Sequence, residues 1–155
     1  MNIFRNAANA LLRPVRNFFL SRKVKQMKTA IENRSLDHFL ELLLGGMQLL
    51  FAVSPAFRKN IRDFNARYCF KSKDGSIAAS AVFKNDRMVM KRNAIDNTSI
   101  TVVFDSGKTL WEFLFSDDPN VFDYILENRL SYSGNLNYML KFGYLAKHVR
   151  LQFGV

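Results

Sequence analysis

The sequence predicts one α+β domain, in which helices cover one face of a five-stranded and mostly antiparallel sheet, preceded by an N-terminal helical extension. Hydrophobic residues recur with a helical period before residue 65, with a period of two from residue 66 to residue 104, and mainly with a helical period afterwards. Such runs of one element type, in place of strict alternation, are typical of α+β proteins. With 155 residues, 48% of them hydrophobic, the chain can bury a substantial core.

Residues 1–54 are predicted to form a basic, amphipathic helical extension. Residues 1–35 carry eight basic side chains and one acidic one, so 8 − 1 = +7 of the formal charge of +10 lies there. At 100° per residue the aromatic and aliphatic side chains share one helical face and the arginines lie opposite, while Pro14 predicts a kink or a break. Six residues are predicted to contact an anionic membrane surface: Phe4, Arg5, Arg13, Arg16, Phe18 and Phe19.

Other roles for this extension stay open. An amphipathic face also packs on its own domain or on a second copy of the chain, which would give a homodimer. A mitochondrial presequence is likewise basic, amphipathic and poor in acidic residues, whereas a secretory signal needs an apolar run that the arginines interrupt. A basic arm alone gives non-specific affinity for phosphates. The nearly neutral remainder has no motif for reading bases, so we expect no nucleic-acid partner.

Residues 36–53 are predicted to form a buried helix pair or one kinked helix. The segment is strongly apolar, but acidic residues and two adjacent glycines interrupt it, so it is too short for a membrane span of about 20 residues. Ser54 and Pro55 then predict the start of another helix, with Ser54 as the capping residue and Pro55 in the first turn.

Four strands follow. Residues 66–71 and 77–83 alternate between apolar and polar side chains around the Asp74-Gly75 turn, which predicts a β-hairpin. The Asn85-Asp86 pair predicts a second turn into a third strand at residues 87–91. A fourth strand is expected at residues 98–104, because threonine, valine and phenylalanine favour extended chain.

The helical period returns after Phe104. One short helix is predicted through residues 110–114 and is opened by Asp105 or Ser106. A second is predicted through residues 122–126, with Asp118 as its capping residue and a proline in its first turn. Asp117 precedes it and is favourable at the positive end of the helix, so we interpret this acidic pair as helix-capping and not as a catalytic acid and base.

The C-terminal part is predicted to contain a last strand and a last helix. Residues 130–133 favour extended chain, and the Gly134-Asn135 pair then precedes an amphipathic helix through residues 136–144.

Residues capable of catalysis or metal binding are few. Cys69 is the single cysteine, and no closely spaced Cys or His pair could hold zinc, so a disulfide scaffold and a zinc finger are both excluded. His38 lies among leucines without a second ligand nearby. The sequence has no glycine-rich phosphate loop and no nucleophile elbow. We therefore expect a protein that is not an enzyme and that uses no metal and no cofactor.

Four segments, taken in order, resemble the sterol carrier protein 2 domain family. They are the strand at Phe64–Phe70, the Asp74-Gly75 turn, the strand at Ser99–Asp105 with the short apolar helix after it, and the Arg129–Leu136 segment with its Gly-Asn pair. The resemblance covers about residues 55–149, so the division into domains is expected at residues 54 and 55, with the lipid-binding domain at residues 55–155.

The resemblance implies a small α+β domain in which helices and a five-stranded sheet enclose an apolar tunnel for a sterol, a fatty acid or another acyl chain. Methionine would suit such a loosely selective site because its thioether chain adapts its shape. Nine residues match the tunnel-lining positions of the family: Phe83, Val102, Phe104, Leu110, Phe113, Leu114, Leu136, Met139 and Leu140.

The functional prediction is non-enzymatic binding or transfer of a lipid, with the N-terminal helix on a membrane surface. The alternative is an accessory interaction module whose core is filled and which oligomerises through that helix. The chain ends in Gly154-Val155 and not in a Ser-Lys-Leu type of peroxisomal signal. The expected location is the cytoplasm, and peripheral association with a membrane stays open.

Overall fold

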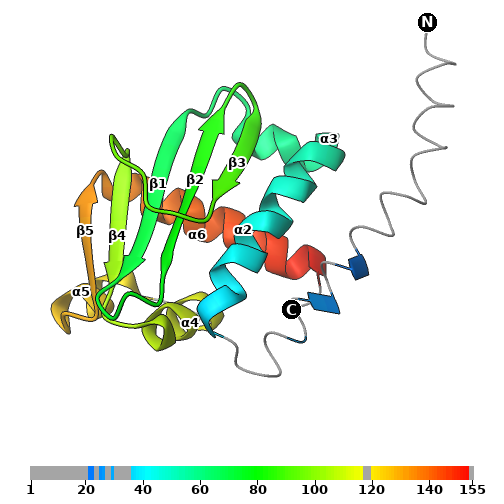
Figure 1. The fold of residues 1–155 in the computed structure, drawn as a ribbon. Coiled ribbons are helices and arrows are strands. Elements are labelled where there is room, and N and C mark those ends of the chain that lie inside the picture. The colour runs from blue at the N-terminus through cyan, green and yellow to red at the C-terminus, as the bar shows by residue number, and fades with distance from the viewer. Residues whose placement is uncertain (1–20, 23–24, 27–28, 30–35, 117–119, 154–155) are drawn as a thin grey trace, which may run out of the picture.

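The computed structural model describes residues 21–22, 25–26, 29, 36–116 and 120–153. Its elements, in chain order, are α2 (Leu36–Val53), α3 (Pro55–Arg58), the 3₁₀ helix η1 (Lys59–Ile61), β1 (Ala66–Ser72), β2 (Ala78–Lys84), β3 (Arg87–Lys91), β4 (Ile100–Phe104), α4 (Gly107–Phe115), α5 (Val121–Leu126), β5 (Leu130–Gly134) and α6 (Leu136–Phe153). Helices lie behind one face of the sheet (Figure 1), as the α+β prediction requires.

The five strands form one sheet in the order β3-β2-β1-β4-β5. The pairs β1–β2, β2–β3 and β4–β5 are antiparallel, which confirms a mostly antiparallel sheet, whereas β1–β4 is parallel. The parallel pair arises because the chain leaves β3 at one edge and crosses the sheet before it enters β4 beside β1.

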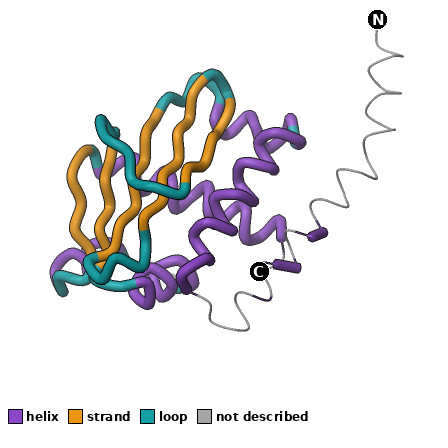
Figure 2. The backbone as a smooth tube through the Cα atoms, in the orientation of Figure 1, coloured by secondary structure: helices purple, strands orange, loops and turns teal. Residues whose placement is uncertain are grey.

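The connection at residues 92–99 crosses the sheet on the face away from the helices, as the tube drawing shows (Figure 2). Ser80 Oγ donates to the Asn93 carbonyl at 2.7 Å, and a guanidinium nitrogen of Arg67 donates to the Asp96 carbonyl at 2.9 Å. This cover explains why Cys69 and Ser80 are fully buried although they point away from the helices.

Both predicted hairpin turns are present. Asp74 Oδ1 accepts hydrogen bonds from the backbone nitrogen and the hydroxyl of Ser76, at 3.0 and 2.7 Å. Asn85 and Asp86 have positive φ angles of 52° and 57°, which match the twist of a tight two-residue hairpin. Local side chains therefore set the pairing of the first three strands.

Helix α2 belongs to the core of the domain. Seven of its residues are buried in the same cluster as the sheet: Phe39, Leu40, Leu43, Leu44, Met47, Leu50 and Phe51. Gln48 Oε1 also accepts a hydrogen bond from the backbone nitrogen of Met90 at 2.7 Å, so α2 covers the β3 edge. The predicted division at residues 54 and 55 thus runs between two helices of one folded unit, because burial of the α2 face joins it to the sheet.

Capping residues fix the starts of three helices. Ser54 caps α3 and Ser106 caps α4, each accepting a hydrogen bond from a backbone nitrogen three residues later, as predicted. The α5 helix is capped by Asn120, which accepts from the Phe122 nitrogen at 3.2 Å, and not by Asp118. Asp118 itself lies outside the described residues. α6 continues well beyond the predicted end at residue 144 and reaches Phe153.

The predicted membrane-contacting residues lie outside the described part of the chain. They are Phe4, Arg5, Arg13, Arg16, Phe18 and Phe19. The described positions just after them, Ser21, Arg22, Lys25, Gln26 and Thr29, are helical and exposed.

Among the described helices, none is long and apolar enough to cross a membrane alone. The segments His38–Val53 and Pro55–Ile61 have the length and composition only when taken together, and they are bent by 105° relative to each other.

Candidate functional site

The structure gathers eight of the nine predicted lipid-contacting residues around one core. Phe83, Val102, Phe104, Leu110, Leu114 and Met139 are buried in the core cluster, and Phe113 and Leu136 pack against it. Leu140 does not join them, because it lies on the outside of α6 with 55% of its surface exposed. The predicted positions are thus close to one another, apart from this one.

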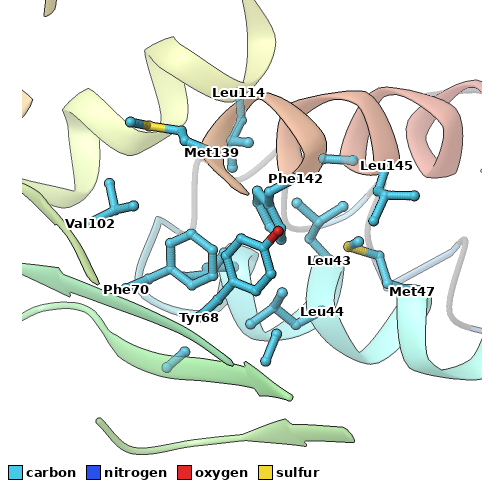
Figure 3. Packing of buried hydrophobic residues seen from close by; sticks show 14 of the residues in the cluster. Leu43, Leu44, Met47, Tyr68, Phe70, Val102, Leu114, Met139, Phe142 and Leu145 are labelled. Carbon is cyan, nitrogen blue, oxygen red and sulfur yellow. The ribbon is translucent and has the colours of Figure 1, made fainter. Parts of the chain in front are cut away.

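Aromatic rings fill the space between the sheet and α6. Tyr68 and Phe70 from β1 and Phe142 from α6 point toward one another (Figure 3), and the Phe70 and Phe142 ring centroids are 4.6 Å apart. The Tyr68 hydroxyl donates to the Tyr138 carbonyl at 2.9 Å, and burial raises the pKa of Tyr68. At this level of the core, protein side chains occupy the place where the resemblance implies a tunnel.

A cleft opens farther along α6, toward its C-terminal end. Its volume is about 610 Å³, which lies within the range of about 300–1,000 Å³ common for small-molecule sites. The end of α2, all but the last residue of α3, η1 and the last turns of α6 supply its lining: Leu50, Val53, Ser54, Pro55, Ala56, Phe57, Asn60, His148, Leu151 and Gln152.

The sharp bend between α2 and α3 builds one wall of this cleft. The Ser54 cap and Pro55 start α3 in a new direction, 105° away from α2. Arg58 then reaches back, and its guanidinium donates to the carbonyls of Phe51 and Ala52 at 2.8 and 2.5 Å. These carbonyls lie at the end of α2, where a helix favours a cation, so the arginine holds the bend in place.

The cleft combines an apolar floor with a polar rim. Leu50 is buried in the core cluster, and Phe57 packs against this cluster. The centre of the Phe57 ring lies 5.1 Å from that of Phe51, so the floor of the cleft is continuous with the core. Ser54, Asn60 and Gln152 are uncharged polar residues of the lining, and His148 adds an imidazole whose ring lies 4.1 Å from that of Tyr144. Such a site suits a ligand with an apolar body and a small polar end.

Sequence reasoning missed this cleft. The Ser54-Pro55 signal located the bend that forms one wall, but the opposite wall comes from the last turns of α6, beyond the predicted end of that helix. No local pattern indicates that these two segments meet.

A polar cluster at the other end of the fold has a structural role. Asp105 Oδ1 accepts hydrogen bonds from the Thr109 and Ser106 hydroxyls, and these hydrogen bonds, chiefly the first, lower the pKa of Asp105. Arg129 pairs with Glu112 of α4 and lies 4.9 Å from the centre of the Tyr124 ring of α5. These contacts tie the start of α4 and the α5–β5 turn to the sheet.

The remaining chemically capable residues do not form a reactive group. Cys69 is fully buried beneath residues 92–99, and His38 is exposed near the start of α2. Within the described ranges, no set of three or more His, Cys, Asp or Glu side chains is arranged to hold a metal ion.

No protein-family model and no curated protein matches this chain. Solved structures do match it. The UbiJ-SCP2 ubiquinone synthesis protein is 19% identical, with 72% of this chain and 98% of that chain covered and a TM-score of 0.51. The sterol carrier protein domain 2 of Helicoverpa armigera is 14% identical, with 73% and 87% covered and a TM-score of 0.49.

An alkylsulfatase from Pseudomonas sp., called Pisa1, also matches, with 11% identity and a TM-score of 0.45, over 81% of this chain and 29% of that chain. At these identities the similarity concerns the fold. The UbiJ-SCP2 structure is matched over 98% of its length, at a TM-score of 0.51. The chain therefore has a sterol carrier protein 2-like fold.

Proposed function

We propose that the protein is a non-enzymatic carrier that binds an amphipathic lipid in the cleft between α3 and the end of α6. The observation that carries this proposal is the cleft itself, whose apolar floor of Leu50 and Phe57 belongs to the core of a sterol carrier protein 2-like fold.

The lipid's polar end is expected to be small enough for hydrogen bonds from the cleft lining to hold it. The polar groups of the lining are hydroxyl, amide and imidazole groups, and among the described residues no lysine or arginine is part of it. Burial of each methylene contributes about 0.8 kcal/mol, so a chain of about 16 carbons would gain roughly 12 kcal/mol before the costs of ordering. Fatty acids, sterols and prenylated quinones are the classes to test, the last because one structural neighbour is a ubiquinone synthesis protein.

The N-terminal extension is proposed to hold this carrier at an anionic membrane. Its support is the charge of 8 − 1 = +7 within residues 1–35 and the phenylalanines on the opposite side of a predicted helix. This arrangement would keep the carrier in the cytoplasm or at the membrane surface.

A second candidate function is an interaction module without a ligand. The close contact of Phe142 with Tyr68 and Phe70 favours it, because these rings fill the interior of the domain. Deletion of residues 1–30 separates the two candidates. Loss of liposome binding by an unchanged monomer supports the carrier, and a changed oligomeric state in light scattering supports the module.

Filling the cleft tests the carrier directly. Ala56 is exposed and lines the cleft, so Ala56→Trp places a large side chain in it. Ala52, near the end of α2, is likewise exposed and is not in the lining given above, which makes Ala52→Trp a matched control. We expect Ala56→Trp to weaken binding of a fluorescent fatty acid by about 10-fold or more, which is about 1.4 kcal/mol, and the control to bind normally.

Native mass spectrometry of the gently purified protein completes the test. A bound lipid whose amount falls in Ala56→Trp and not in Ala52→Trp supports the cleft. If the wild-type protein holds no lipid and binds neither fatty acid, sterol nor prenylated quinone saturably, the carrier function is wrong. Equal binding by both variants would place the ligand elsewhere.

A further inference from the structure

The outer face of α6 carries three large apolar side chains that the core does not use. Leu140, Tyr144 and Leu151 are 55%, 47% and 68% exposed. At 100° per residue they lie within an arc of about 40° along the helix. The opposite side of α6 carries Phe142 and Val149, which are buried, so the core of the described residues does not include the exposed three.

Basic side chains accompany this apolar face. The α6 helix contains Lys141, Lys147 and Arg150 and no acidic residue. Arg150 is directed inward, where it donates to the Leu114 carbonyl and lies 4.5 Å from the centre of the Phe115 ring. Lys147 is exposed and lies beside this arc, about 20° from Leu140, and the Lys141 ammonium lies 5.6 Å from the centre of the Tyr144 ring.

The exposed apolar pair on α5 shows that charge distinguishes these faces. Phe122 and Leu126 are similarly exposed, at 57% and 79%, but the exposed acidic residues Asp123 and Glu127 stand next to them. An anionic surface would repel that pair and attract the α6 face, since each lysine near an anionic membrane adds to binding.

We infer that the outer face of α6, formed by Leu140, Tyr144, Lys147 and Leu151, docks on an anionic membrane surface. The apolar side chains would enter the boundary between headgroups and acyl chains, and Lys147 would lie among the phosphates, as in interfacial amphipathic helices. Leu151 also lines the cleft. Docking would therefore bring the cleft to the membrane. The purpose of this arrangement rests on the proposed carrier function, whereas the binding of α6 to the membrane does not.

The test uses the full chain and sedimenting vesicles of phosphatidylcholine, with or without phosphatidylglycerol. Leu140→Asp/Tyr144→Asp introduces two acids one helical turn apart into the α6 face. Phe122→Asp/Leu126→Asp makes the same change, at the same spacing, in α5. We expect the α6 variant to bind anionic vesicles about 10-fold more weakly and the α5 variant to bind as the wild type does. Lys147→Gln should cost about five-fold, and added salt should reduce this difference.

Three results would overturn the inference: an α6 variant that binds anionic vesicles normally, an equal loss in both double variants, or a changed oligomeric state of the α6 variant in light scattering. The last would assign the face to a second copy of the chain. Circular dichroism and Trp111 fluorescence verify that each variant is folded. Lipid binding in vesicle-free buffer tests the carrier function separately, so either proposal can fail while the other stands.

Discussion

Gly134, at the end of β5, is a position where one added methyl group should strongly destabilise the protein. Its φ angle is +113°, and a Cβ built on it would lie 2.3 Å from the Ser99 carbonyl oxygen and 3.0 Å from the Ile100 Cα. Both neighbours are backbone atoms, so neither can turn aside as a flexible side chain does. The next nitrogen, that of Asn135, donates to the same Ser99 carbonyl at 3.3 Å, which fixes the close approach.

The cost of Gly134→Ala follows from two separate effects. A residue other than glycine at this φ costs about 1–3 kcal/mol. Pushing β4 and β5 apart to relieve the contact costs roughly another 1–3 kcal/mol, as overpacking does elsewhere. We therefore expect a loss of about 4 kcal/mol in the free energy of unfolding, which corresponds to a fall of roughly 8–16 °C in Tm for a chain of this length.

Two other glycines serve as controls in which these effects are separated. Gly75 has a φ of +75° but no atom within 4 Å of its added Cβ, so Gly75→Ala should cost only the conformational part, about 1–2 kcal/mol. Gly143 lies within α6, likewise with open space at its Cβ. Gly143→Ala should therefore stabilise the protein by about 0.5–1 kcal/mol.

Urea unfolding, followed by circular dichroism and by Trp111 fluorescence, measures the three changes. Trp111 is the single tryptophan, and its ring lies 4.9 Å from that of Phe39 in α2, so it reports on the α2–α4 contact. The reasoning fails if Gly134→Ala loses no more stability than Gly75→Ala, because the backbone contact would then not be what requires glycine. A destabilised Gly143→Ala would contradict the open space at that helix position.

Two further changes test the buried tyrosine and a helix cap. Burial raises the pKa of Tyr68, so the stability that it contributes is complete below its ordinary pKa of about 10 and is lost as the pH rises toward the raised value. Tyr68→Phe should cost about 1 kcal/mol near neutral pH, because the hydrogen bond to the Tyr138 carbonyl is lost. It should also reduce the loss of stability at alkaline pH. A urea midpoint that falls as steeply with alkaline pH in the variant as in the wild type would contradict this. Ser106→Ala removes the cap that accepts from the Thr109 nitrogen at 3.3 Å and should cost about 1 kcal/mol in the same assay, whereas Ser131→Ala, on the exposed part of β5, should cost little.

Local signals predicted most of the elements because each depends on a few neighbouring residues. The alternation after residue 66, the Asp74-Gly75 turn and the positive φ pair at Asn85-Asp86 specify the first three strands almost to the residue. Where two caps competed, the local signal failed. Asp118 and Asn120 are both good capping residues, and the helix begins after Asn120.

Pairing between distant segments could not be predicted from such local signals. The parallel β1–β4 pair depends on the route of residues 92–99 across the sheet, and nothing in either strand's own pattern specifies it. The membership of α2 in the core is a similar case. Its apolar face was evident, but the partner that covers that face, the β3 side of the sheet, is chosen by the packing of the whole domain.

The same distinction between local signals and long-range packing applies to the candidate site. The sequence by itself determined the helix start at Ser54, the apolar residues around Leu50 and Phe57, and the separation of a strongly basic N-terminal segment from a nearly neutral remainder, because backbone preference, hydrophobicity and charge belong to individual residues. Only the tertiary structure decided that the end of α6 closes a cleft against α3, and that Leu140 faces outward while Met139 is buried. Those outcomes depend on how α2, α3 and α6 share one core, and that packing is settled among residues far apart in the chain.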